Sequence, residues 1–283
     1  ERLGNPHGRY ASVHIAGTKG KGSLAAMVES VLRAAGHSTG LFTSPHLQDF
    51  RERIRVDRKM IAHDSLAALI AELRPHIPAT ADITFYEIST ALALEWFARQ
   101  GVEIAVLEVG LGGRLDATNV VAPAVCAIMP ISFDHVELLG DTIESIAVEK
   151  AGIIKCGVPV VVAPQPVAAQ SVLRERTAAI RAPLIDVDAA WAWNCEESSA
   201  AGQQFALWPT ARPQDKCNYQ LPLLGTHQVE NAAVAVALVQ QLREQGWSIP
   251  QRAIARGLKT VQWPARCEVL QGEPPVMLDC AHN

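Results

Sequence analysis

Short apolar runs alternate along the chain with segments in which apolar residues recur at helical spacing. Five runs are short enough and apolar enough to form strands in the interior of a sheet. They are residues 12–16, 39–42, 104–109, 125–131 and 158–163. Strands that alternate with helices usually form a parallel sheet with helices packed on both faces. We therefore predict an α/β fold built on a mostly parallel sheet.

The predicted helices are marked by apolar residues three or four positions apart. They cover residues 24–35, 66–73, 85–96 and 229–242. Gly36 is expected to end the first helix, and Asp64 is expected to cap the second. The buried face of the second helix would consist of Leu66, Leu69, Ile70 and Leu73. The third helix, with Phe85 at its start, is expected to be mostly buried.

The composition changes near residue 186, where Trp, Gln, Ser and Pro begin to occur in short stretches. Residues 186–221 are therefore predicted to form a small antiparallel β region. Residues 276–278 follow two prolines and are predicted to form another strand. We expect one large domain over residues 1–270, and the first strand of a truncated C-terminal α/β domain within 271–283.

Composition and charge exclude several classes of protein. Hydrophobic residues make up 49% and charged residues 19% of the 283-residue chain, which is typical of a globular protein. A formal net charge of −4 without a basic run argues against a nucleic-acid partner. No apolar run approaches the ~18 residues of a membrane span. The six dispersed cysteines form no CxxC pair, so we expect a cytoplasmic location.

The ends of the sequence lead to a further expectation. The first residue is not Met, the start does not form a signal peptide, and the last residues follow a predicted strand directly. We therefore expect the sequence to be a piece of a longer protein, cut at both ends.

A glycine-rich segment, residues 17–23, lies between the first predicted strand and the first predicted helix. Backbone N–H groups and a helix N-terminus at such a position can bind phosphate oxygens, and Lys21 supplies a positive charge. The segment departs from the GxxxxGK[ST] pattern, because Ile15 and Gly22 stand at its first and last positions and Ser23 follows one place later. The context still predicts a P-loop-type fold; a flexible glycine turn is the alternative.

The segment is similar to the GTNGKGS loop of folylpolyglutamate synthases and dihydrofolate synthases, which are relatives of the Mur ligases. Lys19 stands where that family usually has Asn, so a contact that needs the Asn amide is in question. The resemblance covers nearly the whole chain in eight ordered blocks. Besides the loop, the blocks are residues 43–47 with 51–54, 84–87, 107–119, 133–135, 149–152, 225–231 and 279–283.

The resemblance implies an ATP-binding domain over residues 1–270 and the start of a glutamate-ligase domain over 271–283. It implies nucleotide contacts at Gly17, Thr18, Gly20, Lys21, Gly22, Ser23, Asn231, Arg266 and Asp279. From the residues alone, Arg266 could instead form a salt link between domains, and Asp279 could cap a turn or helix.

The implied metal ligands are Ser44, Glu108, His135 and, as a carbamate, Lys150. Glu108 lies at the end of one predicted strand and His135 follows the next, so both can reach the carboxyl edge of the sheet, where such folds bind ligands. Without the resemblance, Glu108 could cap the glycine turn after it, and His135 could be a core histidine. Ser44 could be a turn residue, and Lys150 could be an ordinary surface or salt-bridging lysine.

The resemblance also implies a substrate site. Phe85, Tyr86 and Glu87 would line a pteridine pocket, in which aromatic faces stack on the heterocycle and a carboxylate accepts its N–H groups. Leu115 would lie at the same site. The alternative is that residues 85–87 form only a packing face of a helix.

The implied activity is an ATP-dependent ligase that joins L-glutamate to a pteroate or a folate through an acyl phosphate. Its catalytic residues would be Lys21, Glu108, His135 and Lys150, and its cofactors ATP and two Mg²⁺ ions, with K⁺ as a further candidate. We expect a monomer. The sequence does not choose between dihydropteroate, tetrahydrofolate or both as acceptors.

Two other functions remain open. A related ligase could act on a UDP-linked peptidoglycan precursor, although Gly22 stands where those enzymes tend to have Thr. A nucleotide-binding protein without catalysis is the second alternative, against which the intact Glu108, His135 and Lys150 argue.

Overall fold

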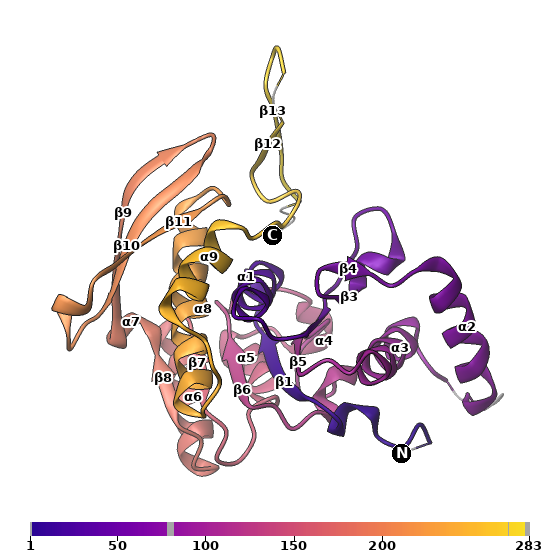
Figure 1. Cartoon of the computed structure of the whole chain (residues 1–283). Helices are drawn as coiled ribbons and strands as arrows, with labels where there is room; N and C mark the ends of the chain where they lie inside the picture. Colours follow the sequence, from indigo (N-terminus) through magenta and orange to yellow (C-terminus); the bar gives the residue numbers. More distant parts are fainter. Residues whose placement is uncertain (1, 78–81, 271, 281–283) are drawn as a thin grey trace.

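The computed structural model describes residues 2–77, 82–270 and 272–280. Its main sheet has eight strands, of which six are parallel and two antiparallel strands lie at one edge (Figure 1). In sheet order they are β4 (Lys59–Met60), β3 (Ile54–Val56), β2 (Thr39–Phe42), β5 (Ile104–Glu108), β1 (Ala11–Ala16), β6 (Val125–Ile128), β7 (Val160–Val162) and β8 (Leu184–Asp186). The predicted α/β fold is confirmed.

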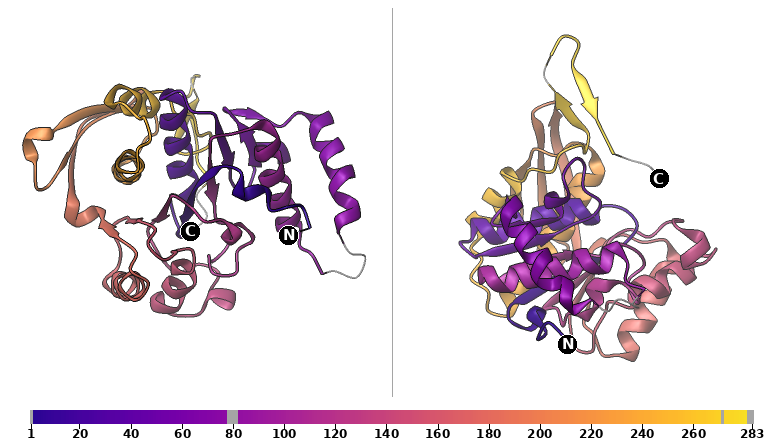
Figure 2. Two further views of the ribbon diagram at one scale, coloured as in Figure 1. Left: turned by 60° about the horizontal axis from the view of Figure 1, so that its bottom comes forward. Right: turned by 90° about the vertical axis from the view of Figure 1, so that its right-hand side faces the viewer.

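Helices cover both faces of this sheet, as predicted. One face packs against α1 (Lys21–Ala34), α8 (Thr226–Glu244) and α9 (Gln251–Lys259). The other packs against α2 (His63–Leu73), α3 (Phe85–Gln100), α5 (Ile143–Ala151) and α6 (Val167–Ala179). Figure 2 shows α1, α8 and α9 on the side of the sheet opposite to α5 and α6. Alternate strand residues therefore enter separate apolar cores, which explains the nearly continuous hydrophobicity of the inner strands.

Shorter helices occupy the connections. Two are α-helical, α4 (Val136–Leu139) and α7 (Val187–Ala190). The 3₁₀ helices span Pro6–Gly8, Phe50–Arg53, Arg74–His76, Ala117–Val120 and Pro213–Asp215. No helix of the described residues is both long and apolar enough to cross a lipid bilayer.

The central strand β1 lies between β5 and β6, and this placement creates the site. Ile15 pairs with Glu108 of β5, and Ala16 pairs with Ile128 of β6. The carboxyl ends of the three strands therefore meet at one edge of the sheet. The loops that follow them, including the glycine-rich segment after β1, emerge side by side there.

The predicted antiparallel region is also confirmed. Strands β9 (Trp191–Ser199), β10 (Gly202–Pro209) and β11 (Cys217–Leu221) form a three-stranded sheet beside α8 and α9. A separate hairpin pairs β12 (Glu268–Leu270) with β13 (Val276–Leu278) and projects from the body (Figures 1 and 2). The domain boundary predicted after residue 270 falls between these two strands. Residues 281–283 of the last motif lie outside the described residues.

Three local predictions were wrong. Helix α1 begins at Lys21 rather than at Leu24, so the glycine-rich loop is shorter than expected. Ala62, not Asp64, is the N-cap of α2, and Asp64 lies inside the first turn. Ile70 on α2 is exposed, because this helix lies at the margin of the molecule and buries only Leu69 and Leu73.

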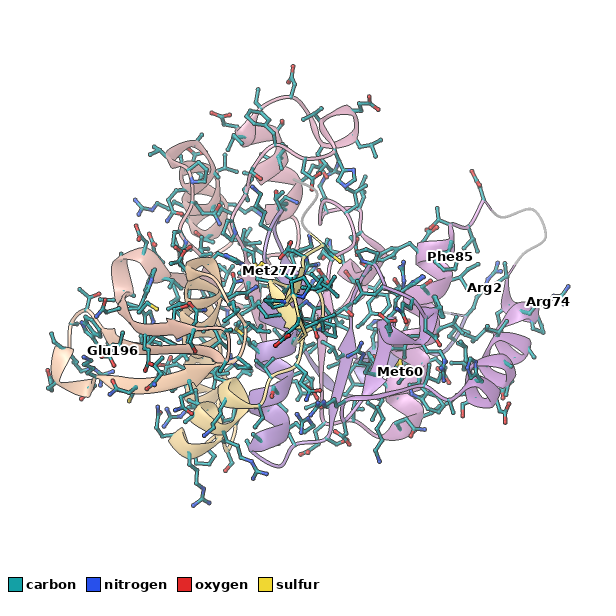
Figure 3. The ribbon with its side chains drawn as sticks, turned by 90° about the horizontal axis from the view of Figure 1, so that it is seen from above. Arg2, Met60, Arg74, Phe85, Glu196 and Met277 are labelled. Carbon is teal, nitrogen blue, oxygen red and sulfur yellow. The ribbon has the colours of Figure 1, made fainter. Side chains whose placement is uncertain are left out.

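Helix α3 begins at Phe85 as predicted, but its first turn is more exposed than expected. Thr84 and Glu87 form a capping box there, in which each side chain accepts from the other residue's backbone N–H. Phe85, the first helical residue, is 61% exposed and lies at the surface (Figure 3). The helix becomes buried only farther along, from Ser89 onward.

Candidate functional site

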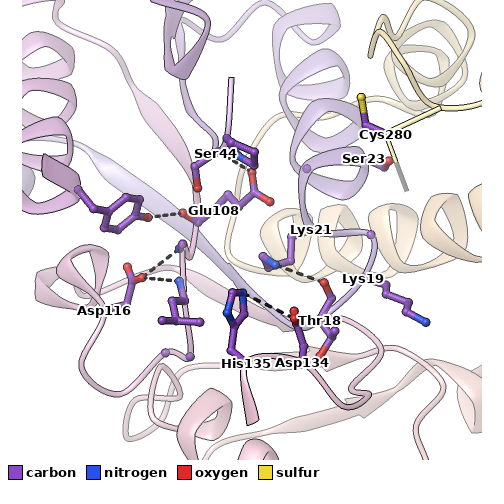
Figure 4. A pocket seen from close by; sticks show the side chains of 18 of the residues that line it. Thr18, Lys19, Lys21, Ser23, Ser44, Glu108, Asp116, Asp134, His135 and Cys280 are labelled. Atoms are coloured by element: carbon purple, nitrogen blue, oxygen red, sulfur yellow. Dashed lines mark hydrogen bonds and ion pairs between the residues drawn. The ribbon is translucent and has the colours of Figure 1, made fainter. Parts of the chain in front are cut away.

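A cavity of about 1170 Å³ opens at the carboxyl edge of the main sheet. Its walls come from the loops after β1, β2, β5 and β6, from the start of α8, and from the base of the β12–β13 hairpin. Figure 4 shows Ser44 and Glu108 on one side of Lys21, with Asp134 and His135 on the other. The structure therefore brings together side chains that lie far apart in the sequence.

The glycine-rich loop is held against the segment that follows β6. Gly17 has φ +143°, and a Cβ there would lie 2.5 Å from the Cβ of Met129, so only glycine fits without a shift. The backbone N–H groups of Thr18 and Lys19 both donate to the carbonyl of Pro130, at 3.0 and 3.3 Å. The Thr18 hydroxyl donates to the carbonyl of Ser132 at 3.1 Å.

These bonds reduce the number of backbone N–H groups in residues 17–23 that are available to bind phosphate. The amides of Thr18 and Lys19 are already paired, and Gly17 and Thr18 act as anchors of the loop. The first helical hydrogen bond joins the N–H of Leu24 to the carbonyl of Gly20, and no side chain caps the helix at Gly20. The N–H groups of the first turn, from Lys21 to Ser23, therefore have no partner within the helix and are suited to phosphate oxygens.

Two glycines at the start of α1, its N-cap Gly20 and Gly22 in its first turn, are needed for close packing. A Cβ on Gly20 would lie 2.6 Å from Oδ1 of Asn231, and a Cβ on Gly22 would lie 2.9 Å from the Trp263 ring. The Trp263 contact explains why no hydroxyl residue follows Lys21. Ser23, one place later, accepts instead from Nε2 of Gln228 at 3.3 Å.

Lys21 and Glu108 provide the opposite charges of the cavity. Nζ of Lys21 donates to the carbonyl of Thr18 at 3.4 Å. The carboxylate of Glu108 is buried and accepts from the N–H of Ser44 at 3.0 Å. Burial raises the pKa of Glu108, while the charge of Lys21, the Ser44 N–H and the charges of Arg266 and Arg53 oppose that rise. A cation close to Glu108 would therefore favour its ionised form.

His135 lies on the opposite wall from Ser44, as the residue before α4. Its backbone is left-handed, with φ 47° and ψ 43°, and its side chain is 53% exposed. Nε2 lies 3.6 Å from Oδ1 of Asp134. Glu108 and His135 line the same cavity, as predicted, although their roles as ligands stay predictions.

Lys150 lies beneath the glycine-rich loop, on α5. Its side chain is buried, and Nζ donates to the carbonyl of Gly17 at 3.0 Å. Burial and the nearby charge of Lys21 lower the pKa of Lys150 to about 8, against the opposing charges of Asp134 and Asp116. An amine with this pKa is partly neutral near physiological pH. Lys150 is not part of the cavity wall itself.

The donor groups fit Mg²⁺ that is shared with a nucleotide. The described residues hold no cluster of three or more His, Cys, Asp or Glu that could bind a metal alone. Mg²⁺ at nucleotide sites usually takes one or two protein oxygens, and phosphates and water complete its coordination. The carboxylate of Glu108 and the hydroxyl of Ser44 border the same cavity and have this chemistry.

The predicted substrate residues are only partly brought together. Tyr86, Glu87 and Leu115 line the cavity, whereas Phe85 does not. The ring of Phe85 packs instead against Phe50, at a centroid distance of 5.5 Å. The reason is the position of Phe85 as the first residue of α3, from which its side chain points outward.

Tyr86 and Glu87 also make contacts that the sequence did not indicate. The Tyr86 hydroxyl donates to the carbonyl of Glu108 at 3.3 Å, and its ring packs against Phe42. The carboxylate of Glu87 accepts from the N–H of Thr84 at 2.7 Å in the helix cap. Both residues thus stabilise the start of α3, which is the alternative that the sequence left open.

The distal nucleotide candidates do reach the cavity. Asn231, Arg266 and Asp279 all line it, although they lie more than 200 positions after the glycine-rich loop in the sequence. Nδ2 of Asn231 donates to Oε1 of Gln228 at 3.1 Å. Asp279 accepts from the N–H of Cys267 at 2.8 Å, across the base of the hairpin. The described part of the hairpin therefore closes one end of the cavity.

Sequence reasoning missed three acidic residues of the wall, Asp116, Asp134 and Glu149. Asp116 accepts from the backbone N–H groups of Gly110 and Leu111, both at 3.0 Å. Asp134 precedes His135 directly. The signal for Asp116 was present in the segment Asp116-Ala117-Thr118, because Asp commonly accepts from the backbone N–H two residues later.

Comparisons with known proteins agree with this geometry. The family model of the Mur ligase middle domain matches residues 15–239. A dihydrofolate synthase/folylpolyglutamate synthase of Bacillus subtilis is 40% identical over 291 residues, covering 100% of this chain and 67% of that protein. A probable bifunctional folylpolyglutamate synthase/dihydropteroate synthase of Haloferax volcanii is 40% identical over 99% of this chain, but only 34% of its own length is matched.

Solved structures are similar over the whole chain. A folylpolyglutamate synthase in complex with AMPPCP and folate superposes with a TM-score of 0.94 at 34% identity. The match covers 100% of this chain and 70% of that chain. The chain therefore spans between about a third and about two thirds of the length of these relatives.

Proposed function

Because the chain belongs to the Mur ligase family, and within it to the folylpolyglutamate and dihydrofolate synthases, we propose that it is the nucleotide-binding part of an ATP-dependent ligase. The ligase joins L-glutamate to a pteroate or folate through an amide bond. The names of the relatives favour a folate substrate over a peptidoglycan precursor, and the solved AMPPCP complex supports a nucleotide at this site.

One observation carries the proposal. The open N-terminus of α1, the ammonium group of Lys21 and the buried carboxylate of Glu108 border a single cavity. A helix N-terminus and a lysine attract the phosphates of ATP, and a carboxylate beside them suits a divalent cation bound to those phosphates. This set of groups is complementary to a magnesium nucleotide.

The reaction that this site supports has two steps. An oxygen of the acceptor carboxylate attacks the γ-phosphorus of ATP, so that ADP leaves and an acyl phosphate forms. The amine of glutamate then attacks the acyl carbon, inorganic phosphate leaves, and the amine loses a proton. Lys21 and the N–H groups of the first turn of α1 would stabilise the charge that develops on the transferred phosphoryl group.

The residues that would hold Mg²⁺ are Glu108 and Ser44, with His135 on the opposite wall as a further ligand. Mg²⁺ bound there would neutralise phosphate charge. Glu108 itself is held in place by the Ser44 N–H and by the burial of β5, so its carboxylate is oriented before any ligand arrives.

Lys150 is proposed to react with CO₂. Its neutral amine would attack the carbon of CO₂, lose a proton and become a carbamate, which is an oxygen donor for a second Mg²⁺. The lowered pKa of Lys150 supports this step, because only the neutral amine is nucleophilic. The carbamate nitrogen keeps one N–H, which can still donate to the carbonyl of Gly17 in place of the ammonium group.

The acceptor is tested by the release of ADP from the full-length protein. Dihydropteroate and tetrahydrofolate are compared at a fixed concentration of glutamate, and release that depends on one or both identifies the acceptor. Lys21→Ala and Glu108→Gln are expected to lower ADP release by at least about 100-fold, the usual cost of losing an electrostatic group in the transition state. Wild-type rates in either variant would refute the proposal.

Matched controls come from the same elements. Glu103 directly precedes β5, at the end of the strand opposite to Glu108, and its carboxylate accepts from the N–H of Ser38 at 2.9 Å. Glu103→Gln should therefore leave ADP release unchanged. Release with UDP-linked muramyl substrates, but with no pteroate or folate, would instead identify a peptidoglycan ligase. The need for K⁺, the monomeric state and the cytoplasmic location stay predictions.

A further inference from the structure

His14 is a buried polar residue in the middle of the central strand. Its neighbours Val13 and Ile15 point into the apolar core under α1, whereas His14 faces the other side of the sheet. Its side chain is fully buried, with 0% exposure. Burying an imidazole in a strand costs free energy unless its polar atoms are paired, so the contacts of His14 are informative.

The imidazole makes one hydrogen bond among the described residues. Nε2 of His14 lies 2.8 Å from the hydroxyl oxygen of Thr118. The Thr118 hydroxyl has a single hydrogen, which it donates to Oδ1 of Asp116. Nε2 of His14 must therefore carry the hydrogen and donate to Thr118. Nδ1 then bears no hydrogen, and it has no partner in the described part of the chain.

This chain of hydrogen bonds ends at the wall of the cavity. Asp116 lines the cavity, and its Oδ2 accepts from the N–H groups of Gly110 and Leu111 (Figure 4). These two residues follow Glu108 almost directly. Burial lowers the pKa of His14 to about 3, so the imidazole is neutral over the physiological range and keeps its role as a single donor.

We propose that His14 is a positioning residue, which acts through Thr118 to fix the carboxylate of Asp116 and the glycine turn after Glu108. His14 does not line the cavity, so its effect on the site is indirect. This role depends on which group donates and which accepts in each hydrogen bond between His14, Thr118 and Asp116. Oδ2 of Asp116 accepts from both backbone N–H groups, while Oδ1 accepts from the hydroxyl and the backbone N–H of Thr118. The N–H of His14 orients that hydroxyl toward Asp116.

A purely structural role makes a different prediction. If His14 only fills space, an apolar residue of similar size should serve at least as well, because it removes the unpaired Nδ1. If His14 positions Thr118, a donor at the Nε2 position is required. Gln places its amide nitrogen near that position, whereas Asn reaches only to the position of Nδ1.

The first experiment measures amide hydrogen exchange at Gly110 and Leu111 in the full-length protein. His14→Leu and Thr118→Val should each raise the exchange rate of both amides about tenfold, the effect of losing one buried hydrogen bond. His14→Gln should restore protection, and His14→Asn should not. Unchanged exchange in His14→Leu, or equal rescue by Asn and Gln, would overturn the proposal.

The second readout uses the full-length protein and rests on the proposed function. His14→Leu should raise the KM for the pteroate or folate acceptor about tenfold and leave the KM for ATP within about twofold, because ATP is assigned to the separate loop after β1. Increased exchange with an unchanged KM for the acceptor would overturn the positioning role. Absence of turnover in the wild type would refute the proposed function, while the exchange measurement still decides between the two roles of His14.

Discussion

The lowered pKa of Lys150 predicts a measurable dependence of stability on pH. A lysine whose pKa is about 8 in the folded protein and 10.5 in the unfolded chain lowers the free energy of unfolding when it is charged. That cost is fully present below pH 8 and disappears above pH 10.5, so the unfolded chain binds more protons between these values. Stability therefore rises with pH in this window.

The magnitude follows from the two pKa values. A shift from 10.5 to about 8 corresponds to about 3 kcal/mol, of which about 2.5 kcal/mol falls between pH 7.5 and pH 10. Lys150→Met removes the titrating amine. The free energy of unfolding of the wild type, minus that of the variant, should therefore increase by about 2.5 kcal/mol over this range.

The assay is urea unfolding of both proteins at a series of pH values in buffers free of CO₂, because carbamylation would change the group that titrates. Lys59→Met serves as the control, since it removes an exposed lysine by the same substitution. Its pH dependence should match that of the wild type. A difference between wild type and Lys150→Met that stays constant from pH 7.5 to pH 10 would refute the reasoning.

Three further predictions concern the loop after β1 and the strand itself. Gly22→Ser places a Cβ 2.9 Å from the Trp263 ring and should weaken the binding of ATP, measured by calorimetry. Adding Trp263→Ala to this variant should recover part of the lost affinity. If no affinity is recovered, the contact with Trp263 is not the cause. Gly17→Ala should lower the free energy of unfolding by at least about 2 kcal/mol in urea, because of its φ of +143° and its contact with Met129; a cost below about 0.5 kcal/mol would contradict this account. Since the pKa of His14 falls from 6.5 to about 3 on folding, stability should fall by about 2.5 kcal/mol between pH 7 and pH 4.5. His14→Leu should remove this part of the acid sensitivity, and an unchanged pH profile would refute the shift.

The inner part of the fold could be predicted because its strands are buried on both faces. Strands β5, β6 and β7 are almost wholly apolar, and the buried strand β1 is interrupted only by Ser12 and His14. The edge strands β3 and β4 were missed, since they are short and partly exposed and carry no such pattern. The cap of α2 was misjudged because an Asp near a helix start is compatible with several positions in the first turn.

The motifs predicted several residues that line the cavity, but they did not predict the hydrogen bonds between them. Glu108 ends β5, Lys21 belongs to the glycine-rich segment after β1, and His135 lies in the connection after β6. The three line one cavity because parallel strands bring the segments at their carboxyl ends to one edge of the sheet. The pairing of the Thr18 amide with Pro130 was not predictable, because it joins segments 112 positions apart. Phe85 shows a related limit, because the direction of its side chain depends on its contact with Phe50, which lies far from it in the sequence.

The connection between His14 and the cavity was likewise beyond sequence reasoning. A lone histidine in an apolar strand indicates only that a polar group is buried. Its function depends on Thr118 and on the donor and acceptor roles along the chain of hydrogen bonds, which no spacing rule specifies.

The central claim is that this cavity activates a carboxylate by phosphorylation, and isotope transfer tests it most directly. The full-length protein is supplied with ATP, glutamate and an acceptor whose reacting carboxylate is labelled with ¹⁸O. If an acyl phosphate forms, its cleavage by the amine leaves one labelled oxygen in each inorganic phosphate released. Phosphate that carries no label while the amide product accumulates would contradict the account.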